Sequence, residues 1–425
     1  MQFEIVSRVY ARISVNEPDR VNRVAQKMKP SAAAPTVLFG AFDRHNFGDL
    51  LFPHLMTALL PGQSFECAGL VARDLRAFGG HRVRALAARP AGHLIHIGGE
   101  LLTCSAWQAA VMLLDPAAAA AVIACHDSDP LAAARWAARQ LGTARSMPYV
   151  AGRGILAAPG RLIFNAVGGV EWAFLTTGQR KEVKAALGEA DWVSVRDHLT
   201  QDALRAEGID VPLCPDPAVM VAACFGEVIR EHRQQGAVKA MRDAFPQGYL
   251  ACQFSADFAD DASLDALAHG LSRVAAETGL GLALFRAGAA PWHDDPALHE
   301  KLLHRLPPGT VQLFPSLHLW DICALIAVSR GVVGSSLHGR IVALAYGLPR
   351  VSLLPPQQGG RPDKRTAFAE TWEPDAVPRS VTVDRIEPAV MQALAVPAGV
   401  LQENAASLRA RYLQSQAQWA GMLLP

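Results

Sequence analysis

Short apolar runs alternate with longer segments of helical periodicity from Pro35 onward. The runs contain few polar residues, which is typical of strands that are covered on both faces. In the first half, they predict strands at Thr36–Ala41, His93–Ile97, Ala121–Cys125, Tyr149–Gly152, Leu162–Val167 and Trp192–Val195. Helical patterns lie between them, near residues 50–60, 103–114, 130–141, 179–188 and 198–207. This alternation predicts an α/β fold with a parallel sheet.

A second alternation follows the proline-rich segment Asp210–Ala218. Its predicted strands are Tyr249–Phe254, Leu282–Arg286, Val311–Phe314, Gly331–Gly334 and Val351–Leu354. Its predicted helices lie near residues 228–243, 263–277, 296–305, 318–328 and 338–346. We therefore expect two doubly wound, Rossmann-like domains that face a cleft. Ligands of such sheets bind at the carboxyl ends of the strands, so the cleft is the expected site.

Four segments follow from this pattern. Residues 1–34 show no clean period and form an extension of unknown role. Residues 35–212 are the predicted N-terminal domain, and residues 213–385 are the predicted C-terminal domain. Residues 386–425 are a helical tail, whose pattern between Val400 and Leu423 would lie across either domain.

Composition narrows the class of protein. Hydrophobic residues make up 51% of the chain and charged residues 19%, which is typical of a well-packed enzyme. The net charge of +1 gives no general attraction to nucleic acid, so an anionic ligand needs a local pocket. Seven cysteines without a C-x-x-C pair indicate buried thiols in a reducing compartment. The longest apolar stretch, Leu101–Leu114, is shorter than the ~20 residues of a membrane helix. We expect a cytoplasmic protein without a transmembrane segment.

The segment from Gly331 to Pro349 carries the strongest functional signal. An apolar strand leads into Ser335 and Ser336, then His338 and Arg340, and an alanine-rich helix follows. Strand, polar turn and helix together point backbone N–H groups and the positive end of the helix dipole at an anion. The alternative is a serine-capped turn with His338 facing solvent.

Two loops of the first half add polar residues at strand ends. In the first loop, Asn46 or Asp49 can cap the next helix, and Gly48 permits a close approach to the backbone. Pro53 lacks an N–H early in that helix, so we expect the helix to become regular only around Phe52. An ordinary capped turn explains this loop equally well; a functional loop requires Asn46 or Asp49 to face the cleft.

The second of these loops holds Gly98, Gly99 and Glu100 directly after a strand. Glycines there let a ligand touch the backbone, and Glu100 can bind sugar hydroxyls. A tight strand-to-helix turn is an equally good interpretation.

Three further polar clusters have structural alternatives. Arg196 ends a strand and offers a fork of donors for phosphate or carboxylate, while Asp197 either caps a helix or orients Arg196. We interpret Asp216, between two prolines, as part of a rigid turn. We interpret residues 292–295 as a helix N-terminus and not as a metal site.

The order of these motifs resembles the polysaccharide pyruvyl transferase family. The resemblance rests on N-F-G-D at 46–49, V-S-V-R-D at 193–197, D-P-A at 216–218, G-S-S-L-H-G at 334–339 and A-L-A-Y-G-L-P at 343–349. It covers about residues 36–355 and implies a two-domain, GT-B-like architecture. The N-terminal domain, residues 35–212, would then lie on the acceptor side of the cleft, and the C-terminal domain, residues 213–385, on the PEP side. It also implies transfer of the pyruvyl group of phosphoenolpyruvate (PEP) onto two sugar hydroxyls as a ketal, with release of phosphate.

The resemblance implies roles for particular residues. Arg196 would contact PEP, the backbone around Leu337 would hold an anionic group, and His338 would bind phosphate or act as the general acid. Many members have arginine where this chain has Ser336, which leaves one anion contact unassigned. Arg340 or Arg44 would supply it.

The implied chemistry begins with protonation of the PEP methylene carbon by His338, and Asp49 is a weaker candidate for the base. It requires no metal and no organic cofactor. The acceptor is a sugar or an oligosaccharide, and a lipid-linked acceptor would place the protein at the inner membrane face. Acceptor specificity would come from loops that include Asn46, Gly48, Gly98, Gly99 and Glu100. Two alternatives stay open, a GT-B glycosyltransferase that uses a nucleotide sugar and a non-catalytic member of the family.

Overall fold

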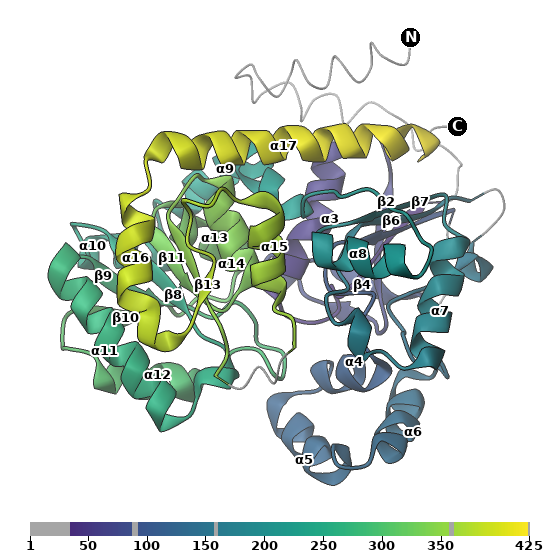
Figure 1. The fold of residues 1–425 in the computed structure, drawn as a ribbon, viewed down its shortest axis with the longest axis horizontal. Coiled ribbons are helices and arrows are strands. Elements are labelled where there is room, and N and C mark those ends of the chain that lie inside the picture. The colour runs from purple at the N-terminus through teal and green to yellow at the C-terminus, as the bar shows by residue number, and fades with distance from the viewer. Residues whose placement is uncertain (1–34, 87–91, 157–159, 357–360, 424–425) are drawn as a thin grey trace.

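The computed structural model describes residues 35–86, 92–156, 160–356 and 361–423. The predicted N-terminal extension at residues 1–34 lies outside this range. Two parallel α/β sheets stand side by side, each covered by helices on both faces (Figure 1). This architecture is the expected α/β fold with two doubly wound, GT-B-like halves.

The first sheet has the strand order β3-β4-β2-β1-β5-β6-β7 among the described residues. Its strands are β1 (Thr36–Phe39), β2 (Phe65–Gly69), β3 (Arg73–Asp74), β4 (Arg82–Ala85), β5 (His93–Ile97), β6 (Leu162–Val167) and β7 (Trp192–Val195). All neighbours are parallel except β3 and β4. Its helices are α3 (Phe47–Leu59), α4 (Ala106–Met112), α5 (Pro116–His126), α6 (Pro130–Leu141), α7 (Thr177–Gly188) and α8 (His198–Ala206).

The second sheet is parallel throughout its described strands, in the order β10-β9-β8-β11-β12-β13. Its strands are β8 (Tyr249–Gln253), β9 (Gly281–Leu284), β10 (Val311–Leu313), β11 (Gly331–Gly334), β12 (Arg350–Leu353) and β13 (Ser380–Val381). The helices of this half are α9 (Val221–His232), α10 (Gly236–Ala244), α11 (Asp261–Thr278), α12 (Pro296–Arg305), α13 (Leu319–Ala327), α14 (Leu337–Ala345), α15 (Lys364–Trp372) and α16 (Ile386–Ala395).

Helix α17 (Ala398–Ala420) runs along both halves (Figure 1). It contacts the first half where the Asn165 amide donates to the Tyr412 hydroxyl at 3.1 Å. It contacts the second half where Arg350 donates to Asn404 Oδ1 at 3.0 Å. One apolar cluster also contains buried residues of both halves, such as Ile95 and Leu325. The halves therefore share a core as well as a helix.

Several predicted elements differ from the structure. The segment Ala121–Cys125 lies in α5 and is not a strand, because Asp115 caps a helix that Pro116 opens and a run of alanines continues. The segment Tyr149–Gly152 is buried but irregular. Residues 228–243 form the end of α9 and the separate helix α10.

Helix α3 is regular earlier than expected. It begins at Phe47, about one turn before the predicted start, and it includes Pro53. Asn46 is its N-cap, since its side chain accepts a hydrogen bond from the Gly48 N–H at 3.0 Å. Pro53 has no N–H to donate to the carbonyl one turn earlier, but the helix continues past it to Leu59.

Candidate functional site

The loops after β1, β5 and β11 meet between the two halves. In each sheet, the strand order changes direction at these points, where an open α/β sheet leaves a crevice at its carboxyl edge. The loop after β9 also takes part, because the Phe47 N–H donates to the Ala287 carbonyl across the halves at 2.9 Å. The candidate site is therefore built from both sheets.

His338 packs directly on the start of α3, at Asn46–Asp49. It is the second residue of α14 and is only 7% exposed. A β-carbon added to Gly48 would lie 1.9 Å from the His338 ring, so only glycine fits there. The rings of Phe47 and Phe52 meet the imidazole edge-on, at centroid distances of 6.4 Å and 5.4 Å. The two motifs that stand far apart in the sequence thus form one contact.

The polar partner of His338 is Asp216. The Nε2 atom of His338 lies 3.7 Å from Asp216 Oδ2 and makes no hydrogen bond with the described residues. Asp216 is fully buried. Burial acts to raise the pKa of this carboxyl, but His338 and Arg196 together hold it below its ordinary value. The interpretation of Asp216 as only part of a rigid turn was incomplete.

Arg196 lies between two carboxylates and is 2% exposed. Its Nη1 donates to Asp216 Oδ2 at 3.0 Å, and its Nη2 makes a short ion pair with Glu100 Oε1. Burial disfavours the charged form, but Glu100 and Asp216 outweigh it and raise the pKa of Arg196 above its ordinary value. Asp197 caps α8 through the Thr200 N–H and forms no ion pair with Arg196.

The Gly98–Glu100 turn faces the same cluster. Gly98 and Gly99 have φ angles of 56° and 72°, in the left-handed region that favours glycine. A β-carbon added to Gly98 would lie 2.3 Å from the Phe52 ring, and one on Gly99 would lie 3.7 Å from Asp49 Oδ1. Asp49, on α3, therefore lies beside the turn that carries Glu100.

The serines before α14 serve its backbone. Ser336 is the N-cap, and its hydroxyl accepts from the Gly339 N–H at 3.0 Å. The Ser335 hydroxyl accepts from the Ser255 N–H at 2.8 Å. Leu337, the first residue of α14, is buried. These contacts fix the turn that presents His338.

Arg44 and Arg340 differ in their surroundings. Arg44 is buried next to the Tyr149 ring, and its Nε has no hydrogen bond among the described residues. Arg340 lies on the far side of α14, where it forms two 2.8 Å hydrogen bonds with the buried Glu373 carboxylate. Arg340 also donates to the Pro378 carbonyl, so its guanidinium is occupied by buried partners and does not face the cleft.

Lys364 is a site residue that the sequence interpretation missed. It is the first residue of α15, and its neighbour Asp363 caps the helix. Desolvation lowers the pKa of Lys364, and the carboxylates of Glu100 and Asp49 act in the opposite direction. The charged segment 361–365 could have indicated a cation in this region, but it lies outside the motifs that carry the family resemblance.

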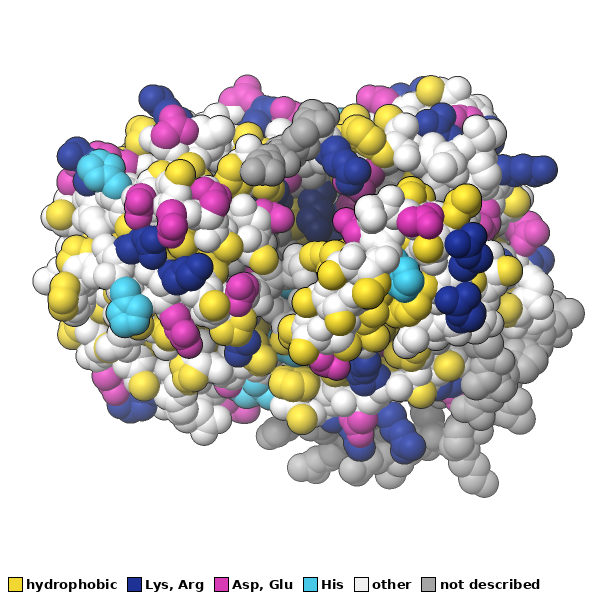
Figure 2. Space-filling model, turned by 90° about the horizontal axis from the view of Figure 1, so that it is seen from below, with side chains coloured by type: hydrophobic (Ala, Val, Ile, Leu, Met, Phe, Trp, Pro, Cys, Tyr) yellow, Lys and Arg dark blue, Asp and Glu magenta, His cyan; other side chains and the backbone are white. Residues whose placement is uncertain are grey.

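A hollow separates the two halves on the face shown in Figure 2, with basic side chains inside it. A cavity of about 410 Å³ receives residues from both halves. Three of its lining residues are aromatic, Trp107, Phe174 and Trp292. Phe174 and Trp292 are 51% and 44% exposed, and Trp292 has a φ of 62°, which is unusual for a bulky residue. Such exposed aromatic rings with nearby polar groups are typical of a ligand pocket.

Comparisons with known proteins agree with this architecture. The sequence model for polysaccharide pyruvyl transferase matches residues 46–355. No curated protein matches the chain. A crystal structure of a candidate UDP-N-acetylglucosamine 2-epimerase from Listeria monocytogenes is similar in fold, with a TM-score of 0.52 and 11% identity over 92% of this chain and 96% of that one. Another UDP-N-acetylglucosamine 2-epimerase has a TM-score of 0.50 and 11% identity, over 92% and 97% of the two chains.

Proposed function

Because the chain belongs to the polysaccharide pyruvyl transferase family, we propose that it moves the pyruvyl group of PEP onto two sugar hydroxyls of a glycan or glycan precursor. The product is a ketal, and phosphate is released. The observation that carries this proposal is the contact of His338 with Gly48 on one side and Asp216 on the other. It joins the family's separate motifs in one buried, charged site.

The donor would bind among the cations of the cleft. PEP carries a phosphate and a carboxylate, and Arg196 offers a planar fork that suits either group. Both edges of Arg196 are paired in the free protein, but Glu100 is 21% exposed whereas Asp216 is fully buried. We propose that a donor oxyanion replaces Glu100 while Asp216 stays. Lys364 then supplies the anion contact that the family's arginine would make at Ser336.

The proposed transfer of the pyruvyl group begins with a proton on the His338 imidazole. The imidazole transfers a proton to the PEP methylene carbon, and the adjacent carbon becomes oxocarbenium-like. One sugar hydroxyl adds to this carbon and gives its proton to the base. The bond between this carbon and the phosphate oxygen then breaks, and phosphate leaves. The second hydroxyl adds to the same carbon and closes the ketal, and its proton returns to His338. Asp216 is placed to orient His338 and to stabilise its positive charge. Asp49 is the candidate base for the attacking hydroxyl.

The acceptor would bind in the aromatic cavity. Its floor continues the Glu100 loop, since Glu100 Oε2 accepts from the Val170 N–H at 3.1 Å and Glu171 lines the cavity. Arg361 lies over the Phe174 ring at 5.3 Å and within 3.5 Å of Glu171. Flat apolar rings with charged groups at their edges suit a sugar, which has apolar faces and a polar rim. A glycan in this cavity would direct hydroxyls toward the carboxylates of Asp49 and Glu100.

The first test is titration of the protein with PEP and with nucleotide sugars, followed by phosphate release in the presence of acceptor glycans. We expect PEP alone to raise the melting temperature, and Arg196→Ala to abolish the shift. Arg205→Ala is the matched control, because that arginine pairs with Asp202 on the surface of α8. A shift with a nucleotide sugar only would favour a glycosyltransferase. Binding of neither would favour a non-catalytic member of the family.

The second test removes the candidate acid. We expect His338→Ala to lower turnover by about 10²–10⁴-fold, the usual contribution of general acid catalysis, while PEP still binds. Phosphate release under saturating PEP measures the change. Circular dichroism and the melting temperature serve as controls for folding. Near-wild-type turnover in a folded variant would remove His338 from the mechanism.

A further inference from the structure

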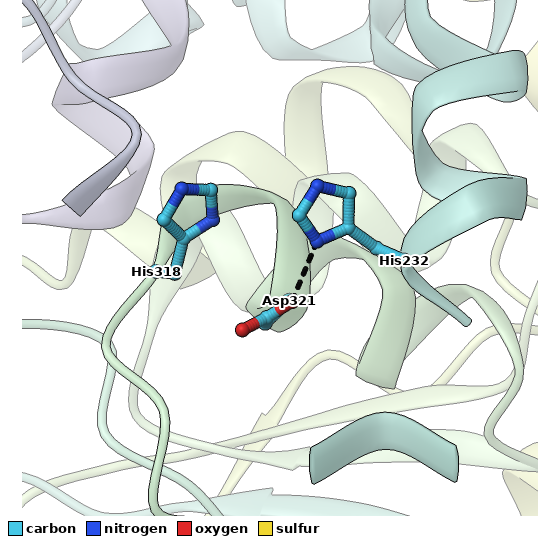
Figure 3. Close-up of side chains that lie close together, drawn as sticks. All are labelled: His232, His318 and Asp321. Carbon is cyan, nitrogen blue, oxygen red and sulfur yellow. Dashed lines mark hydrogen bonds and ion pairs between the residues drawn. The ribbon is translucent and has the colours of Figure 1, made fainter. Parts of the chain in front are cut away.

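Two histidines and an aspartate lie together away from the His338–Arg196 cluster. His232 ends α9, His318 precedes α13, and Asp321 lies in the first turn of α13. Figure 3 shows both imidazole rings beside the Asp321 carboxylate. His232 Nδ1 lies 2.6 Å from Asp321 Oδ1, and the ligand atoms of all three residues lie within 4.8 Å of one another.

Neighbouring groups hold this cluster in shape. The Ser316 hydroxyl donates to the second oxygen of Asp321 at 2.6 Å, which fixes the direction of the carboxylate. The histidine rings are stacked, with centroids 5.3 Å apart and an interplanar angle of 14°. His318 Nδ1 is buried and has no hydrogen-bond partner among the described residues. A buried imidazole nitrogen without a partner is costly unless something binds it.

We propose that His232, His318 and Asp321 bind a divalent transition metal, with zinc as the preferred ion. Two imidazole nitrogens and one carboxylate oxygen form a common three-ligand set for Zn²⁺, and water would occupy the remaining position. Imidazole ligands select against Mg²⁺ and Ca²⁺, which take oxygen ligands. Ser316 has the place of an outer partner that orients a ligating carboxylate.

The position of the site suggests what the metal stabilises. The ion would join the end of α9 to the start of α13 within the second half. His318 also abuts the first half, since a β-carbon added to Gly79 would lie 2.9 Å from its Cε1 atom. Next to it, the Leu317 carbonyl is 2.9 Å from His45 Nε2. The metal would therefore stiffen a segment of the second half on which the first half rests.

Zinc binding is tested on protein without a polyhistidine tag that has been stripped with a chelator. We expect one Zn²⁺ per chain by calorimetry and by elemental analysis, and a raised melting temperature. The variants His232→Gln and His318→Asn should lose this stoichiometric binding. His269→Asn should keep it, because that histidine is exposed on α11 and distant from the cluster in sequence. Ser316→Ala should weaken the affinity about tenfold.

A spectrum of the unaltered chain completes the test, since a variant can fail to fold. Co²⁺ added to the stripped protein should give visible absorption of a site with nitrogen and oxygen ligands, and Zn²⁺ should displace it. Absence of this spectrum would overturn the proposal. Equal zinc binding by wild type and the double variant His232→Gln/His318→Asn would also overturn it, as would a preference for Mg²⁺ over Zn²⁺.

Discussion

Gly48 and His338 act as a single feature at the scale of residues. The imidazole occupies the space that any β-carbon on Gly48 would need. We expect Gly48→Ala to displace His338 and to lower turnover at least tenfold, although the substitution removes no functional group. Steady-state phosphate release measures this effect. Gly226→Ala is the control, because nothing lies within 4 Å of its added carbon, and it should leave turnover unchanged.

Glu100 gives a second prediction at this scale. If a donor oxyanion replaces Glu100 on Arg196, removal of that negative charge should favour PEP. We expect Glu100→Gln to lower the Kd for PEP about fivefold, which corresponds to about 1 kcal/mol for a partly exposed pair. Calorimetric titration measures the Kd, and Glu207→Gln is the control, because that carboxylate pairs with Lys184 instead. Weaker binding would show instead that Glu100 orients Arg196 for the donor.

The residue scale also shows where sequence reasoning reaches its limit. Arg340 was a candidate for the donor contact because it follows His338 by two positions. On a helix, residues two positions apart point in nearly opposite directions, so Arg340 enters the core when His338 faces the cleft. Asp216 was set aside because its partners, Arg196 and His338, come from other segments. Such long-range pairings are not visible in one sequence.

The start of α8 supports a prediction at the scale of elements. Asp197 caps this helix, and burial together with the charge of Glu100 raises its pKa to about 6. Between the ordinary pKa of about 3.9 and this value, the folded protein binds a proton that the unfolded chain has lost. The contribution of Asp197 to the free energy of unfolding therefore falls as the pH rises through this window.

Asp197→Asn separates capping from titration, because asparagine caps helices equally well. We expect the variant to match wild type near pH 4 and to be more stable at pH 7.5, by up to about 3 kcal/mol. Urea denaturation at both values gives the difference. Asp202→Asn, an exposed change on the same helix, should show the same small offset at both. A pH-independent offset for Asp197→Asn would contradict the prediction.

Most of the short apolar runs were predicted correctly as strands, but an alanine-rich run and two strands with polar residues were not. The predicted strands His93–Ile97, Leu162–Val167, Trp192–Val195 and Gly331–Gly334 match β5, β6, β7 and β11 residue for residue. The run Ala121–Cys125 became a helix because a short apolar segment fits either state, and its alanines favour a helix. Strands β2 and β4 were missed because polar residues such as Glu66 and Arg84 interrupt them.

At the scale of the whole molecule, the two halves are joined by a shared core and a shared helix. They share buried apolar residues, and α17 contacts both. We expect one calorimetric unfolding transition, with equal calorimetric and van't Hoff enthalpies. Trp419→Ala, a change in the fully buried part of α17, should lower the stability by about 3–5 kcal/mol and keep a single transition. Two resolved transitions in the wild type would show that the halves unfold separately.

The clustering of the candidate site residues was predictable at this scale, whereas the presence of Lys364 near them was not. His338, Arg196, Asp49 and Glu100 were all placed near the carboxyl ends of parallel strands, and such ends share one edge of a sheet. Lys364 reaches the cleft at the start of a helix that follows a long connection from β12. Only the path of that connection in space brings it there. No helix among the described residues is long and apolar enough to cross a membrane.

Helix α17, which contacts both halves, has a consequence for the order in which substrates bind and for the step that limits the rate. A two-part enzyme that swings shut spends binding energy on closure and releases product only after it reopens. Because α17 contacts both halves, we expect it to limit such closure, so that little binding energy is diverted into it. We therefore expect donor and acceptor to bind in random order. The step that limits the rate would then be bond making itself rather than a motion of the halves.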